Sequence, residues 1–176
     1  MRQLLIAGDI CLFTSAPQDL KHSKWLFVLF LFLLVPMYAI VLYQLQLVSF
    51  ETALHQAAFS VVLTLLLLSV GLWFSNKSSR FIQTASAFMG SAVALGLFML
   101  IYMYLMTTTY GFDGFEAKYP TFPLKMIGGF LTWNFAILAH ILRHAFSKTA
   151  FFAMGLSFLL VFSTWRIMSL AWPFIS

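Results

Sequence analysis

The sequence predicts an all-α polytopic membrane protein, a bundle of five transmembrane helices. Three observations support this fold class: long apolar stretches fill most of the 176 residues, the charges lie almost entirely between them, and only 9% of residues are charged. A bilayer core needs roughly 20 apolar residues of helix to cross it, and a soluble domain carries about 25% charged residues. The predicted spans cover approximately residues 25–45, 55–74, 81–106, 123–145 and 149–172.

The chain is long enough for one such domain, so residues 25–176 are expected to form a single five-helix transmembrane domain. Residues 1–24 then form a cytoplasmic juxtamembrane segment. Its first 13 residues are too few to span and too apolar for a solvated tail, which predicts a short interfacial helix. Ser15, followed three residues later by Gln18, fits a capping box and predicts a second short helix leading into the first span.

The positions of Lys and Arg predict the orientation of the bundle. Seven basic residues lie before the first span and in the second and fourth connections, whereas the opposite side holds only Lys118 and Lys125. The N-terminus is therefore predicted to be cytoplasmic and the C-terminus to be outside. The net charge of +5 is too scattered for a nucleic-acid surface, and the single Cys11 excludes an internal disulfide.

Small residues at four-residue spacing lie in the third and fourth predicted spans. Such residues let helix backbones approach closely in lipid. We expect these two faces to form the central contact of the bundle through Ser86, Gly90 and Ala94 on one side and Gly128 and Ala136 on the other. A substrate path along the same faces is the alternative.

Polar side chains inside the spans are candidates for binding a ligand or a lipid, namely Arg166, Asn134 and Thr132. Arg166 lies six residues before Trp172, hence about 9 Å below the outer interface by helical rise. Its side chain can instead extend outward to water or phosphate. A single amide such as Asn134 more often bonds a neighbouring helix than a substrate.

Two histidines, His140 and His144, are four residues apart, so both rings point the same way along a helix. They are candidate ligands for a metal or a haem. Because zinc needs at least one more ligand and no pairing pattern is present, interfacial histidines are the preferred interpretation and no cofactor is predicted.

The third connection is aromatic, acidic and contains glycine, which predicts a partner-docking loop through Tyr110, Phe112, Asp113, Phe115 and Glu116. No nucleotide-binding, zinc-protease or nucleophile-elbow motif is present in the sequence. The spans also carry no carboxylate of the kind that coupled transporters use. The sequence therefore predicts a protein that is not an enzyme.

Five spans, a cytoplasmic N-terminus and the segment Phe13–Leu20 (FTSAPQDL) resemble the Yip1-type membrane protein family in its compact bacterial form. This resemblance implies a non-enzymatic membrane protein, because the eukaryotic members act in membrane trafficking by binding partners. It carries over no catalytic residue. Together with the compact chain, it favours a bacterial cytoplasmic membrane.

Three functions therefore remain open at the level of sequence. The first is a non-catalytic accessory, scaffold or membrane-organising subunit that packs against a membrane-protein partner or another copy of itself within the lipid bilayer. The second is a small channel or a lipid or solute carrier component, with a polar path around Arg166, Asn134 and Thr132. The third is a haem or metal subunit that uses His140 and His144.

Overall fold

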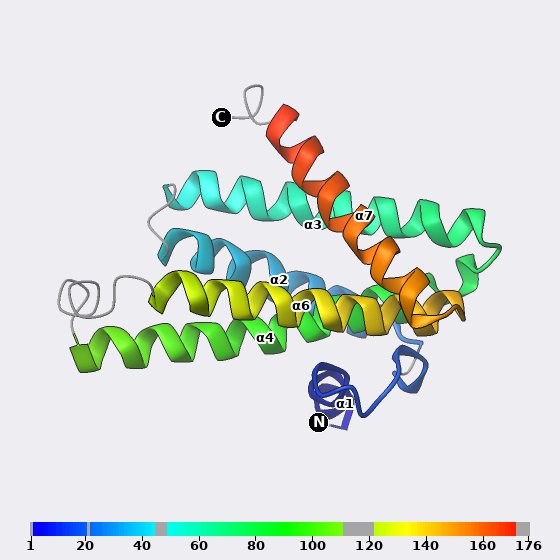
Figure 1. Ribbon diagram of the computed structural model, residues 1–176, viewed down its shortest axis with the longest axis horizontal. Helices are drawn as coiled ribbons and strands as arrows, with labels where there is room; N and C mark the ends of the chain where they lie inside the picture. Colours follow the sequence, from blue (N-terminus) through cyan, green and yellow to red (C-terminus); the bar gives the residue numbers. More distant parts are fainter. Residues whose placement is uncertain (1, 21, 45–48, 111–121, 172–176) are drawn as a thin grey trace.

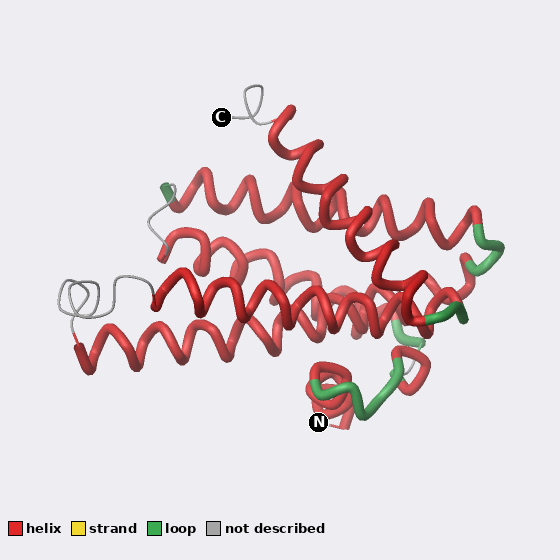
Figure 2. The backbone as a smooth tube through the Cα atoms, in the orientation of Figure 1, coloured by secondary structure: helices red, strands yellow, loops and turns green. Residues whose placement is uncertain are grey.

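The computed structural model describes residues 2–20, 22–44, 49–110 and 122–171, and within these ranges the protein is helical and contains no strand (Figure 2). The elements in chain order are α1 (Arg2–Cys11), η1 (Pro17–Asp19), α2 (Lys24–Gln44), α3 (Phe50–Phe74), η2 (Ser78–Arg80), α4 (Phe81–Tyr110), α6 (Phe122–Phe146) and α7 (Ala150–Ala171). Within the described residues, α2, α3, α4 (with η2) and α7 are long and apolar enough to cross a bilayer. The chain is therefore an integral membrane protein.

The long helices α2, α3, α4 and α6 run side by side, and α7 crosses them obliquely (Figure 1). The start of α2, the α3–α4 connection and the α6–α7 connection lie together at one end of the bundle. We call this the basic end, because it carries Lys24, Lys77, Arg80, Arg143 and Lys148. The short helix α1 lies across the bundle near this end and is seen end-on in Figure 1.

The second long helix begins at Phe50, five residues before the predicted start at His55. Ser49 caps it, since its hydroxyl accepts a hydrogen bond from the Thr52 amide at 3.3 Å. Glu51 lies in the first turn, where a negative charge is favourable near the helix N-terminus. The sequence prediction treated these capping residues as part of a connection, because they are polar.

The predicted capping box on Ser15 is wrong by one residue. The N-cap of η1 is Ala16, whose amide donates to the Asp19 carboxylate at 2.7 Å. Asp19 therefore takes the place that was predicted for Gln18. The element is a single 3-10 turn rather than a second α-helix.

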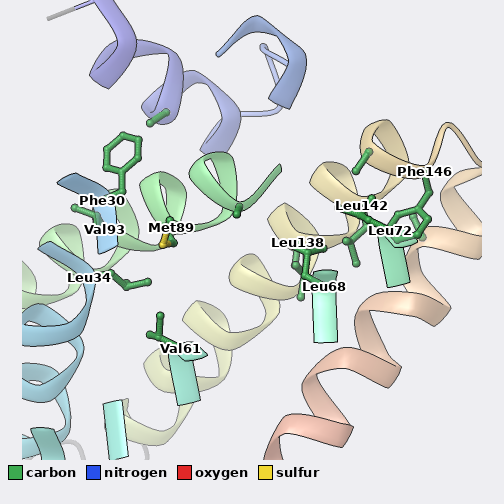
Figure 3. Close-up of a cluster of buried hydrophobic side chains, with 14 of the residues drawn as sticks. Phe30, Leu34, Val61, Leu68, Leu72, Met89, Val93, Leu138, Leu142 and Phe146 are labelled. Carbon is green, nitrogen blue, oxygen red and sulfur yellow. The ribbon is translucent and has the colours of Figure 1, made fainter. Parts of the chain in front are cut away.

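The main core is formed by buried apolar side chains from α1, α2, α3, α4, α6 and α7 (Figure 3). Phe30 of α2 meets Met89 and Val93 of α4 at one side, and Leu138 of α6 lies beside Leu68 of α3 at the other. The most extensive contacts join α2 to α4 and α2 to α3. A second buried cluster joins the N-terminal segment to α4 and α6 through Ile10, Leu20, Ala87, Ile137 and Ile141.

The small-residue faces predicted to meet each other do not do so. A side chain at Gly90 would contact Phe30 of α2 and Ala7 of α1, whereas one at Gly128 of α6 would have no described atom within 4 Å. Ser86 is buried and Ala94 is half-buried on α4, and Ala136 is half-buried on α6. The contact between α4 and α6 includes Ala87 against Ile137 and Ile141 instead. The spacing of small residues predicted that another helix packs closely on α4, but it did not predict which helix does so.

Candidate functional site

The N-terminal segment, residues 2–20, is held against α4 and α6 rather than extending into solvent. The Gln83 side chain of α4 donates to the Leu20 carbonyl at 3.1 Å, and a ring nitrogen of His140 bonds the Ser15 carbonyl at 3.0 Å. Ile10 and Leu20 are fully buried beneath these bonds. Buried apolar contacts and hydrogen bonds together fix this segment beside the basic end.

One residue of the predicted histidine pair, His140, is hydrogen-bonded to the N-terminal segment. The rings of His140 and His144 lie 4.7 Å apart, and the His140 ring also packs edge-on against Phe13 at 5.4 Å. Because a carbonyl oxygen only accepts, Nε2 of His140 donates to Ser15, and the lone pair needed to bind a metal is then left only on Nδ1. No group of three metal-ligating side chains occurs within the described residues. The metal or haem function stays a prediction.

The lone thiol, Cys11, is half-buried at the end of α1 and lies 3.4 Å from the Ala7 carbonyl and 3.5 Å from the Ser91 carbonyl. Burial raises its pKa from 9.0 to about 11. A raised pKa keeps the thiol protonated, and only the thiolate reacts. We expect iodoacetamide to alkylate Cys11 about 100-fold more slowly at about pH 8 than it alkylates an unperturbed thiol. The same protein unfolded in denaturant is the reference, and equal rates would contradict the buried position.

At the basic end, two cations hold the last turn of α6. The Lys77 ammonium donates to the Phe146 carbonyl, and Nη1 of Arg80 donates to the Ala145 carbonyl at 3.2 Å and to the Ser147 hydroxyl at 2.9 Å. The last carbonyls of a helix have no partner within it and carry partial negative charge. These two cations therefore cap α6 and tie the α3–α4 connection to the α6–α7 connection.

A cavity of about 550 Å³ opens between these connections and η1. Its charged and polar lining includes Arg80 of η2, Gln83 of α4, Arg143 and His144 of α6, and Lys148 of the following turn. No carboxylate lines it. Burial lowers the pKa of the Lys77 ammonium beside it, and the positive charges of Arg80 and Lys148 lower that pKa further. The structure thus places several positive charges around one hollow.

The α6 segment from residue 128 to residue 134 is exposed on nearly every side. From Gly128 to Asn134 only Phe130 is half-buried, and the other residues are exposed. The Thr132 hydroxyl donates to the Gly128 carbonyl at 2.8 Å, so its own helix satisfies it. The Asn134 amide has no hydrogen-bond partner in the described part of the chain.

Arg166 of α7 is exposed and lies over the Trp165 ring, with its guanidinium carbon 5.9 Å from the ring centroid. Because α7 crosses the bundle obliquely, its C-terminal end lies level with the middle of α3 (Figure 1). The predicted depth of Arg166 assumed a helix parallel to the others. Within the described residues, no hydrogen bond joins Arg166, Asn134 and Thr132, so the polar path stays a prediction.

The predicted docking loop lies almost wholly outside the described residues. Phe112, Asp113, Phe115 and Glu116 fall in the range 111–121, and Tyr110 is the last residue of α4. The role of this loop in binding a partner stays a prediction.

The cavity at the basic end was not predicted from the sequence. The distribution of Lys and Arg grouped Arg80, Arg143 and Lys148 on one side of the membrane, but not around one hollow. Their juxtaposition depends on how η1 docks and on how two connections meet, and no local pattern encodes either feature.

The sequence matches no protein-family model, and it has no significant match among curated proteins or among solved structures. The resemblance to the Yip1-type family stays a prediction.

Proposed function

We propose that this protein is a non-catalytic accessory or scaffold subunit, and that it binds a partner membrane protein through residues 128–134 of α6. The observation that carries the proposal is the exposure of Gly128, Gly129, Thr132 and Asn134. Membrane helices use such small and polar residues where they contact another helix, rather than where they face lipid.

The position of Asn134 supports this proposal. It lies four residues before Leu138, so the two side chains share one stripe of α6. Leu138 is buried in the main core, whereas Asn134 is exposed and its amide has no partner among the described residues. A polar amide at mid-helix is costly in lipid unless it is hydrogen-bonded. A partner helix that carries a donor or an acceptor would satisfy it.

In this proposal α6 is the fifth span, the N-terminus is cytoplasmic and the C-terminus is outside. The 25 residues of α6 are long enough to cross a bilayer core. The Lys and Arg residues at the basic end support the orientation, since positive charge favours the cytoplasmic side. The helix α1, which lies across the bundle, would then run along the cytoplasmic surface. The compact chain and the resemblance favour a bacterial cytoplasmic membrane.

The test is native mass spectrometry of the protein extracted from its own membrane in mild detergent. We expect a complex that contains a distinct protein subunit in addition to the 20.0 kDa chain. Asn134→Leu should weaken the association about 3- to 30-fold, because an interhelical hydrogen bond in a membrane contributes about 0.6–2 kcal/mol. Gly128→Leu should weaken it further by blocking close approach.

Leu66→Ala on α3 is the matched control, since Leu66 is also exposed but belongs to a different helix. It should leave the complex intact. All three variants should keep the thermal stability of the isolated chain, because nothing in the described structure packs on these positions closely. A bare monomer from native membranes, or equal complex formation by Asn134→Leu and the unchanged protein, would contradict the proposal.

A further inference from the structure

The described part of the protein neutralises the cations around the cavity at the basic end only in part. Among the described residues, no ion pair forms and no acidic residue lines the cavity. Asp19 of η1 is exposed and accepts the Ala16 amide, and its negative charge acts on His144 of the cavity wall. Helix capping offsets part of the charge of Lys77 and Arg80, because a helix C-terminus carries only about half a negative charge. A net positive charge therefore remains in the cavity.

Donors remain available there. Only Nη1 of Arg80 bonds the end of α6, so the rest of its guanidinium is available to a ligand. The side chains of Arg143 and Lys148 are exposed and make no hydrogen bond within the described residues. By contrast, Gln83 and Thr84 in the same wall already donate to backbone carbonyls. The unused charged donors in the lining are thus those of Arg80, Arg143 and Lys148, which favours an anion.

The position of the cavity at one end of the bundle favours an anion that belongs to the membrane surface. Two exposed tryptophans, Trp25 at the start of α2 and Trp73 near the end of α3, lie at the basic end. Tryptophan is enriched where the hydrocarbon core meets the headgroups. A cavity at this end would therefore face lipid phosphates, and basic cavities between membrane helices do bind such headgroups.

We propose that this cavity binds a phosphate group through Arg80, Arg143 and Lys148, and that the phosphate belongs to an anionic phospholipid headgroup or to a free phosphate. A volume of about 550 Å³ lies in the range of small-molecule sites, about 300–1,000 Å³. The residues that line the cavity come from segments 17–18, 80–84 and 143–148. Because these segments are distant in sequence, the cavity forms only in the folded bundle. This inference is independent of partner binding through α6.

The experiment measures binding of short-chain phosphatidic acid to the purified full-length protein in a neutral detergent, by native mass spectrometry and by titration. The double variant Arg143→Gln/Lys148→Gln removes two charged donors without removing a bond that the structure contains. We expect it to bind phosphatidic acid about 10-fold more weakly, because a hydrogen bond to a charged group is stronger than a neutral one. Lys24→Gln/Arg166→Gln is the matched control, since it removes the same charge from two residues that do not line the cavity, and it should bind normally.

Competition with inorganic phosphate distinguishes the two sources of the phosphate. If inorganic phosphate displaces phosphatidic acid, the cavity binds a free phosphate; if only the lipid binds, it binds a headgroup. Either result supports the site. Unchanged binding by the Arg143/Lys148 double variant, or an equal loss in the control, would overturn it. Should the double variant unfold, the single variant Lys148→Gln is used, with the same expected direction and with Lys24→Gln as its control.

Discussion

Replacing Gly90 by alanine should destabilise the bundle by about 1–3 kcal/mol, which is the usual cost of overpacking a core. A Cβ at this position would lie 2.9 Å from the ring of Phe30 and 3.1 Å from the Cβ of Ala7. Neither atom can easily retreat, because the Phe30 and Ala7 side chains are both buried. Gly90→Leu should have a larger effect and separate α1 and α2 from α4. The measurement is thermal unfolding in detergent.

Gly96→Ala on the same helix is the control. The atoms that its Cβ would meet belong to the thioether end of Met37, which is flexible and can rotate away. Alanine is also the better helix former, by about 1 kcal/mol. We expect the Gly96→Ala protein to unfold close to the temperature of the unchanged protein. Equal destabilisation by the two substitutions would contradict the tight three-helix contact at Gly90.

Replacing Ile10 by alanine should release the N-terminal segment from α4 and α6. Ile10 is completely buried against Leu20 and Ile141, and truncating a buried isoleucine costs about 2–5 kcal/mol. A loss of this size at the centre of the contact between the N-terminal segment, α4 and α6 should shift the segment toward an undocked state. Cys11 would then become solvated, and its alkylation at about pH 8 should accelerate by up to about 100-fold as its pKa falls toward the ordinary value.

Leu12→Ala tests whether this effect depends on burial. Leu12 lies two residues away and is 65% exposed. Substitutions at such surface positions change stability by less than about 0.5 kcal/mol. The Leu12→Ala protein should therefore keep the slow alkylation rate of the unchanged chain. Slow alkylation of Cys11 in the Ile10→Ala protein would show that the segment does not depend on this contact.

The predicted segments correspond to the long helices of the structure because hydropathy is a local property. Each apolar stretch becomes one helix, and the boundaries differ where a cap lies outside the apolar run, as at Ser49. Four of these helices are long and apolar enough to span a membrane, which supports the predicted class of protein. The remaining long helix, α6, corresponds to the fourth predicted span and is less apolar because it carries Asn134, His140 and Arg143.

The contacts between helices were harder to predict. Gly90 was predicted to pack against the fourth span, but the groups that lie close to it are Phe30 and Ala7 rather than side chains of α6. Gly128 has the same residue type at the same kind of spacing, yet it is exposed. Spacing along one helix identifies a face. It does not identify which neighbour covers that face.

The sequence by itself determined that this protein belongs in a membrane, because the free energy of burying apolar helix in lipid depends on the length and composition of each stretch alone. It also determined that Arg80, Arg143 and Lys148 lie on one side, since chain direction alternates from helix to helix. Only the tertiary structure decided that the N-terminal segment docks on α4 and α6, that residues 128–134 of α6 stay largely uncovered and that these cations surround a cavity. Each of these features depends on shape complementarity between segments far apart in the chain, which no local pattern of residues specifies.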